Sequence, residues 1–311
     1  MLKSHIEAFL KAKSKKSKKT ASTYRTAVTS WLAWAEGEGV EPLTTEGVIG
    51  FHSYLVDTTT PPTVSTYMAG IAGFLEFMDV MGEGTAVNMT RVRYEVRNGP
   101  RSYSHMNVVQ LDDLRKREMP RLVEYLENYP IPDERRGDYN VRLSALRNIA
   151  IFWTLYETAC RIGEARRLDR SHISHDTKTA VVTGKGNRPH TLRFGYPESR
   201  AIPAILAYLA ERTDRGSALF VSHSRNSSGK RLSDTSLHLA IKNAMAATGL
   251  DERLTPHDIR HYRAIMMLRQ DMPLHVIQQF LNHKDIGTTR AFYAPITDED
   301  DMLRHLSRLN S

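Results

Sequence analysis

Apolar residues recur at helical spacing through the N-terminal part of the chain. Residues 20–37 carry apolar side chains three and four positions apart, and Thr20 or Ser22 can cap the helix that this predicts. Residues 45–55 and 64–81 repeat the pattern, and threonines, prolines or glycines end each segment. We therefore expect a small, all-helical N-terminal domain.

The helical pattern breaks at residues 91–101, where four arginines are spread through a segment that ends in Gly99-Pro100. An interdomain linker that lies along phosphates has this composition, and so does an ordinary polar connection. A chain of 311 residues usually forms more than one core. We place the domains at 1–98 and 99–311.

A second, larger helical region begins at Leu111. Within it, Thr179–Thr183 and His190–Phe194 are short strand-like runs on either side of a glycine-containing turn at 184–187. The sequence thus predicts a mainly α protein, in which an α-rich second domain contains one small antiparallel β-hairpin.

Composition favours a cytoplasmic protein. Apolar residues make up 41% of the chain, which is enough for folded cores, and Cys160 is the single cysteine, so no disulfide framework can form. No run of about 18 apolar residues exists to span a membrane. The N-terminus lacks the apolar stretch of a secretory signal.

Charge is distributed unevenly along the chain. The net charge is +8, but residues 1–25 alone carry +7 and residues 26–90 carry eight acids with no lysine or arginine. The lysine-rich stretch is either a solvated, poorly ordered tail or an arm that orders on nucleic acid, and the two interpretations are compatible. The asymmetry indicates a polyanionic partner.

Attack on a phosphodiester needs fixed cations, because negative charge develops on the non-bridging oxygens. Arginine matches two phosphate oxygens and keeps its charge. Arg161 lies near the end of an apolar helical run, and Glu164 lies three residues on, where it can orient a neighbour or form an ordinary surface ion pair. Lys185 lies between two glycines at the hairpin tip, where it is either a groove-reaching cation or an exposed turn lysine.

A helix start places a histidine and an arginine together. Thr255 is a cap, Pro256 suits the first helical position, and His257 and Arg260 then share a face near the N-terminus, where phosphate is favoured. His261 follows His257 at i+4, but the metalloprotease pattern is absent and no third ligand is near in sequence. We expect no metal site.

The last stretch contains a histidine and a tyrosine. Asn282 can take the left-handed position that ends a helix, and His283 follows it. Tyr293 lies in a short predicted helix next to Phe292, where a tyrosine is often only part of a core. Cys160 lies in an apolar run without a base beside it, which disfavours it as a nucleophile.

These motifs form an ordered set: TACRIGEARRL, VVTGKGNRPHTLRF, LTPHDIRHYRAIMML and IQQFLNHKDIGTTRAFYA. In that order, over about residues 105–296, the chain resembles the tyrosine recombinases of the phage-integrase (Xer/integrase) family. The helical N-terminal part resembles the core-binding domain of that family only loosely. The resemblance implies a two-domain, C-shaped clamp on DNA.

The resemblance also implies roles for the site residues. Arg161 and Arg260 would hold the scissile phosphate, and Lys185 would protonate the leaving 5′-oxygen. His257 and His283 would hydrogen-bond the phosphate or handle the proton of the nucleophile.

Two further residues complete the implied site. Glu164 would support it from behind, and Tyr293 would attack to form a 3′-phosphotyrosine. The resemblance implies no metal or nucleotide cofactor. It implies double-stranded DNA sites as the substrate and a synaptic homotetramer, with a C-terminal helix begun at residues 297–300 docking on a neighbouring protomer.

The basic arm, the linker and the hairpin turn are expected to contact DNA. The residues are Lys15, Lys16, Lys18, Lys19, Arg91, Arg93, Arg97, Arg101 and Arg188.

The chain departs from the family pattern in three ways. Asn282 stands where glycine is usual, Tyr293 is one residue later than the usual position (here Phe292), and the acidic block at 26–90 is unusual for a DNA-wrapping domain. Two alternatives remain at this stage: a DNA-relaxing enzyme like the type IB topoisomerases, and a non-catalytic DNA-binding relative. Integrase, transposon recombinase and resolver are not distinguished.

Overall fold

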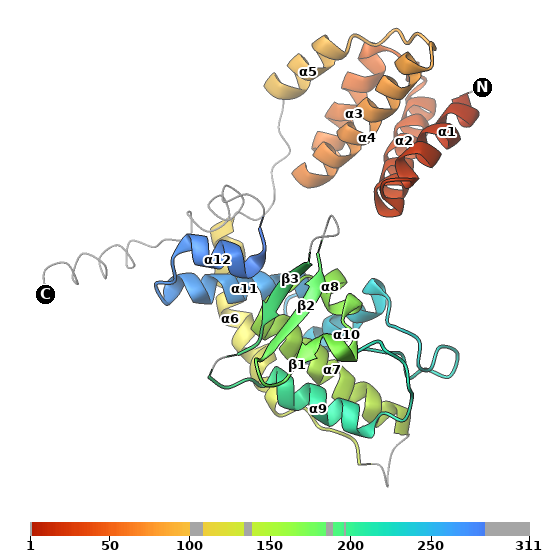
Figure 1. Cartoon of the computed structure of the whole chain (residues 1–311). Helices are drawn as coiled ribbons and strands as arrows, with labels where there is room; N and C mark the ends of the chain where they lie inside the picture. The colour runs from red at the N-terminus through yellow and green to blue at the C-terminus, as the bar shows by residue number, and fades with distance from the viewer. Residues whose placement is uncertain (1, 100–107, 134–138, 185–188, 196, 284–311) are drawn as a thin grey trace, which may run out of the picture. The chain divides into compact units, whose positions relative to one another are not determined.

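The structure is a computed structural model, and it divides the chain into two compact units, Met1–Met106 and Asn107–Ser311. The residues that it describes are 2–99, 108–133, 139–184, 189–195 and 197–283 (Figure 1). Four predicted site residues lie outside these ranges: Arg101, Lys185, Arg188 and Tyr293. Phe292 and the expected C-terminal docking helix also lie outside them.

The first unit is built from helices joined by short turns and loops. Its helices are α1 (Leu2–Ser14), α2 (Lys18–Glu38), α3 (Thr45–Thr58), α4 (Pro61–Val80) and α5 (Met89–Asn98). Trp31, Phe51 and Phe74 are fully buried in one core between them. The helical periodicity is therefore confirmed in this unit, although α2 begins at the cap Ser17 rather than at Thr20 or Ser22.

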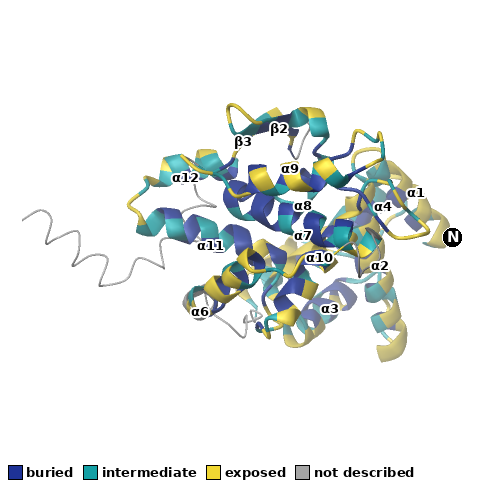
Figure 2. Cartoon of the chain, turned by 90° about the horizontal axis from the view of Figure 1, so that it is seen from below, coloured by how far each residue is buried: buried dark blue, intermediate teal, exposed yellow. Residues whose placement is uncertain are grey.

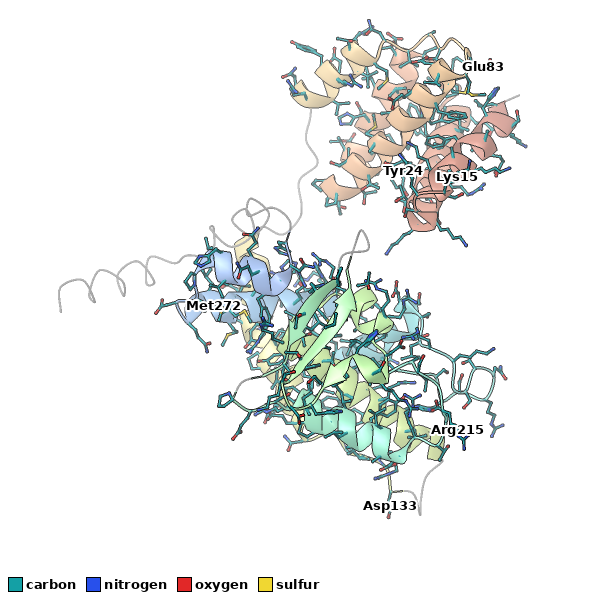
Figure 3. All side chains as sticks on the ribbon, viewed as in Figure 1. Lys15, Tyr24, Glu83, Asp133, Arg215 and Met272 are labelled. Atoms are coloured by element: carbon teal, nitrogen blue, oxygen red, sulfur yellow. The ribbon has the colours of Figure 1, made fainter. Side chains whose placement is uncertain are left out.

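The described part of the basic arm (residues 1–25) is folded, so one of the two interpretations of its lysine-rich stretch, the poorly ordered tail, was wrong. Ile6, Phe9 and Leu10 of α1 are buried against the core of the first unit. These three residues are spaced so that they lie on one face of a helix. The pattern was not recognised in the sequence because lysines surround it. Lys15 lies in the turn between α1 and α2 (Figure 3). The lysines thus project from ordered helices and their turn.

The predicted linker was also wrong over residues 91–98, which belong to α5. The side chain of Asn88 accepts a hydrogen bond from the Arg91 N–H and caps this helix. Val92 is 2% exposed and packs into the core of the first unit. The Asn88 cap, buried Val92 and partly buried Val96 stabilise a helix that its three arginines made look irregular.

The acidic block is partly paired with the basic residues that flank it. Arg91 contacts Glu46 at 2.8 Å, and the His5 ring lies 3.4 Å from the carboxylate of Glu83, which is labelled in Figure 3. Exposed pairs of this kind contribute little to stability. The Arg91–Glu46 pair does neutralise part of the negative charge on the first unit.

The second unit surrounds α7 (Tyr139–Thr158), which is buried along much of its length (Figure 2). The remaining helices are α6 (Val108–Glu127), α8 (Ile162–Arg167), a 3-10 turn (Arg170–His172), α9 (Ala201–Glu211), α10 (Asp234–Ala247), α11 (Pro256–Arg269) and α12 (Leu274–Leu281). In the described part of the chain no helix has the length and apolarity needed to cross a membrane.

One small antiparallel sheet lies on this helical body. Its strands are β1 (Ile173–Ser174), β2 (Thr179–Thr183) and β3 (Pro189–Arg193), in the order β1-β2-β3. The β2–β3 hairpin confirms the prediction, and β1 was not predicted because two residues are too few to show alternation. The mainly α fold class is confirmed.

Candidate active site

Arg161 lies at a break between two helices. The structure ends α7 at Thr158, Ala159 takes a left-handed conformation with φ of +46°, and Arg161 is the N-cap of α8. Arg161 therefore lies near the end of the apolar helix, as expected, but the second helix that begins at Arg161 was not predicted. Ala159 in its left-handed conformation turns the chain sharply. Arg161 therefore begins a new helix and does not extend α7.

Glu164 holds Arg161 through both its backbone and its side chain. One carboxylate oxygen accepts the Arg161 backbone N–H at 2.8 Å, and the other lies 3.2 Å from Nη1 of Arg161. Glu164 is 1% exposed, so this is no ordinary surface pair. The Arg161 side chain keeps 39% of its surface exposed. A buried carboxylate thus orients an accessible guanidinium.

The start of α11 follows the prediction from the Thr255-Pro256 pair. Thr255 is the N-cap, and its backbone N–H and hydroxyl donate to one oxygen of Asp258 at 2.7 and 2.8 Å. The other oxygen accepts two hydrogen bonds from buried Arg115 of α6, at 2.6 and 2.8 Å. Burial alone would raise the pKa of Asp258, but Arg115 and Thr255 outweigh it and lower that pKa.

Arg260 joins the segments that carry the other site residues. It is 4% exposed, and its guanidinium donates to the carbonyls of Ala159 at 2.5 Å and Leu281 at 2.6 Å. Ala159 lies two residues before Arg161, and Leu281 lies two residues before His283. One side chain therefore brings together two segments that are more than a hundred residues apart in sequence.

His283 follows the end of α12. Asn282 caps that helix in the left-handed conformation, with φ of 50° and ψ of 49°, as its position predicted. The His283 backbone N–H donates to the Gln278 carbonyl at 3.1 Å, which continues the turn. Burial, with Arg260 and Arg161 nearby, lowers the pKa of His283 to about 4.

His257 and His261 pack edge to face, with ring centroids 4.6 Å apart. His257 is partly exposed to solvent. Its pKa is nevertheless lowered, mainly because the surrounding protein desolvates the ring and also because the positive charge of Arg260 is nearby. Burial lowers the pKa of His261 further, to about 3. Near neutral pH these imidazoles are uncharged, so they accept or donate hydrogen bonds without adding positive charge. Among the described residues no group of three or more His, Cys, Asp or Glu side chains is placed to hold a metal ion.

Cys160 lies beside Arg161 but is not activated. It is 4% exposed, and burial raises the pKa of its thiol to about 12. A thiol in this state is a poor nucleophile.

The hairpin tip is connected to the site through Arg167. Its Nε donates to the carbonyl of Thr183, the last residue of β2, at 2.9 Å. Lys185, two residues later, lies outside the described residues.

The DNA-binding candidates that are described lie exposed on the first unit: Lys15, Lys16, Lys18, Lys19, Arg91, Arg93 and Arg97.

Arg115 and His190 were not predicted from the sequence as site residues. Arg115 is 143 residues from its partner Asp258, and no local pattern connects the two. His190 follows the hairpin turn and interacts electrostatically with Arg161, Glu164 and Arg260. Its alternation with buried strand residues was the available signal, because alternate strand residues share a face.

A helical body that carries a small sheet, with arginines and histidines gathered from distant segments, is the arrangement of a tyrosine recombinase catalytic domain. A family model described as the phage integrase family matches residues 112–299. The chain belongs to this family of tyrosine recombinases.

Curated relatives support the same grouping. The chain is similar to the tyrosine recombinase XerC of Alcanivorax borkumensis, with 33% identity over 159 residues, 50% of each chain. It is also similar to XerC of Corynebacterium glutamicum, with 33% identity over 147 residues, 47% of this chain and 46% of that one. The match thus spans about half the length of each relative.

Solved structures share the fold at low identity. A XerH site-specific recombinase bound to difH substrate, in a pre-cleavage complex, has a TM-score of 0.59 at 16% identity, covering 86% of this chain and 71% of that one. A lambda integrase dimer bound to a COC′ core site has a TM-score of 0.59 at 15% identity, covering 94% and 76%.

Proposed function

We propose that this chain is a site-specific DNA recombinase, which cleaves and rejoins DNA strands through a 3′-phosphotyrosyl intermediate. The observation that carries the proposal is the bridging guanidinium of Arg260. It binds the carbonyls beside the Arg161 and His283 segments, and its own helix begins with His257. Family membership and the DNA-bound neighbours support the same conclusion.

The site chemistry fits phosphoryl transfer. Arg161 and Arg260 bind the non-bridging oxygens and stabilise the charge that grows on them in the pentacoordinate state. His257 and His283 have lowered pKa values, so near neutral pH each can accept a hydrogen bond or a proton. Proton acceptance is the task that an attacking phenol requires of its neighbours.

The proposed step conserves one phosphate ester bond. The Tyr293 oxygen attacks phosphorus, its proton passes to a histidine, and a bond forms between phosphorus and the phenolic oxygen. The bond to the 5′-oxygen breaks, and Lys185 donates the proton that the leaving oxygen needs. Reversal with another 5′-hydroxyl rejoins the strands. No metal or nucleotide cofactor takes part in these steps.

DNA and further copies of this chain are the proposed partners. The two units would close on duplex DNA as a C-shaped clamp, and four chains would form the synaptic complex through the C-terminal segment. The basic side chains of the first unit would contact the phosphates, together with Arg101 and Arg188. Their number would appear as the slope of log affinity against log salt, about −0.9 per phosphate neutralised.

The direct test is a covalent adduct with DNA. Full-length protein is incubated with duplexes from the DNA that flanks its gene, and the mixture is run on a denaturing gel. Wild type should form an adduct that survives detergent, and Tyr293→Phe should form none. Tyr129→Phe, which removes a phenolic oxygen elsewhere in the second unit, should leave the adduct unchanged. An adduct that persists in Tyr293→Phe would exclude Tyr293 as the nucleophile.

The displaced position of the tyrosine can be tested with the same gel. The double substitution Phe292→Tyr/Tyr293→Phe moves the phenol by one residue, about 100° around the expected helix. We expect little or no adduct from this variant. Full activity would show that position 292 presents the nucleophile equally well.

The two alternative functions predict different results with plasmid DNA. A topoisomerase-like enzyme would relax supercoiled plasmid as a monomer and without sequence preference. A non-catalytic relative would bind tightly and in a salt-sensitive manner, yet form no adduct. A recombinase should instead exchange strands between two copies of one sequence.

A further inference from the structure

His190 lies on the inner face of the sheet, directly after the hairpin turn. It pairs with Val182 across the β2–β3 ladder, and the pair Ala180 and Leu192 lies two residues along. Directly paired residues of an antiparallel sheet project from the same face. Val182, Ala180 and Leu192 are 2%, 1% and 2% exposed, so that face is buried. The His190 ring therefore points towards the second unit, and the residue is half-buried.

Charged groups from two helices surround this ring. Glu164, Arg161 and Arg167 act on it from α8 and its cap, and Arg260 acts on it from α11. Three guanidinium groups thus oppose one carboxylate around a single imidazole. Burial is the largest cause that lowers the pKa of His190, and the three arginines lower it further, while Glu164 raises it.

One ring nitrogen of His190 is not satisfied. Nδ1 is buried and has no hydrogen-bond partner among the described residues. Native proteins satisfy nearly all of their buried polar atoms, and the exceptions mark strained, catalytic or ligand-completed positions. Arg161 and Arg260, the proposed phosphate ligands, both act electrostatically on His190, so a ligand bound to them would change its environment.

We propose that His190 is a phosphate-contacting residue, which takes up a proton when a phosphodiester binds at Arg161 and Arg260 and then donates a hydrogen bond to it. This inference rests on the proposed function. A bound phosphate adds negative charge where the arginines now create a positive potential, and an opposite charge within about 4–6 Å favours the protonated ring. The proton comes from water.

The contact would strengthen during the reaction. The pentacoordinate state carries more negative charge than the bound diester, so a protonated His190 binds that state more tightly than the ground state. His190 would therefore raise the cleavage rate more than the affinity for DNA. A residue that only packs the sheet would have neither effect.

Histidine NMR on the full-length protein tests the protonation directly. The ring nitrogens are labelled with ¹⁵N, the pH is titrated, and the titration is repeated with inorganic vanadate, which mimics pentacoordinate phosphorus. The signal that disappears in His190→Asn is that of His190. Its midpoint should rise by about one pH unit or more with vanadate. An unchanged midpoint at the highest soluble vanadate concentration would overturn the proposal.

A matched histidine provides the control. His175 lies in the β1–β2 turn, at the opposite end of β2 from the hairpin tip. The signal removed by His175→Asn should not move when vanadate is added. If both signals moved together, vanadate would be acting on the whole protein, and the response of His190 would not support a site-specific contact.

Single-turnover cleavage separates this proposal from the proposed function. On a duplex in which wild type forms an adduct, His190→Ala should slow adduct formation about 10²-fold, while DNA affinity stays within about twofold. His190→Asn should lose less, because an amide can donate a hydrogen bond without carrying charge. Wild-type rates in both variants would refute the proposed role of His190 but not the recombinase function. Absence of any wild-type adduct would refute the recombinase function, and the vanadate titration would still test the phosphate contact.

Discussion

The ion pair between Arg115 and Asp258 should be a major stabilising contact of the candidate site. Both side chains are almost fully buried, with exposures of 6% and 8%, and two hydrogen bonds of 2.6 and 2.8 Å join them. The substitution Arg115→Met keeps most of the apolar volume and removes the charge. It leaves one oxygen of Asp258 buried without its partner.

Removing one partner of a buried pair typically costs about 3–5 kcal/mol. Here two contributions remain, because Thr255 still donates twice to Asp258 and the N-terminus of α11 still favours a negative charge. We therefore expect a loss near the lower limit, about 3 kcal/mol. The control is the double variant Arg115→Met/Asp258→Asn, in which both charges are removed. It should lose less stability than the single variant, because no buried charge is left unpaired.

The loss should also depend on pH. In wild type the pKa of Asp258 is lowered on folding, so its stabilisation is present above the unfolded value and disappears as the pH falls through the folded value. Without Arg115 that pKa rises, and protonation then relieves the buried charge. The destabilisation should thus be largest near neutral pH and smaller in acid.

Urea-dependent hydrogen exchange of α11 peptides measures this effect in the second unit, without interference from the first. The same samples provide the adduct rate under native conditions. A loss below about 1 kcal/mol, or one that does not change with pH, would show that Asp258 does not depend on Arg115.

Three further predictions concern single side chains. Asn282→Ala should destabilise the second unit by about 1 kcal/mol, because alanine is strained in the left-handed conformation, and Asn282→Gly should not destabilise it. Equal urea midpoints for these two variants would contradict this prediction. His261 has a folded pKa of about 3 against about 6.5 when unfolded, so the folded state should lose stability as the pH falls below about 6.5. His261→Gln should flatten this loss in urea titrations at pH 7 and pH 5, and an unaltered pH slope would count against it. Glu164→Gln should lower the free energy of unfolding by about 2 kcal/mol, because it weakens the bonds to Arg161, whereas Glu127→Gln, at an exposed pair, should lower it by almost nothing. Similar losses for the two variants in urea unfolding would refute this distinction.

Several elements could be predicted because their signals are local. Val28, Trp31 and Ala35 recur at helical spacing and are buried on one face of α2. The Thr255-Pro256 start of α11 and the left-handed Asn282 depend on the conformations of single residues. Such preferences act within one helical turn, so the chain order alone shows them.

The failures have an equally physical cause. Charge density in α1 and α5 pointed to a tail and a linker, but buried Phe9 and Val92 decide their structure through contacts with other helices. The sharp break between α7 and α8 was not predicted, because nothing local shows that Ala159 adopts a positive φ. Tertiary packing overrode local preference at each of these places.

The order of motifs along the chain was sufficient to identify the family, since each motif is a short run of residues with its own local chemistry. The environment of those residues was not accessible in that way. Whether Glu164 is buried, which carbonyls Arg260 binds, and whether an imidazole is neutral all depend on groups brought close by folding from positions up to 143 residues apart. Burial and electrostatic potential depend on distance in space, and only the folded chain defines those distances.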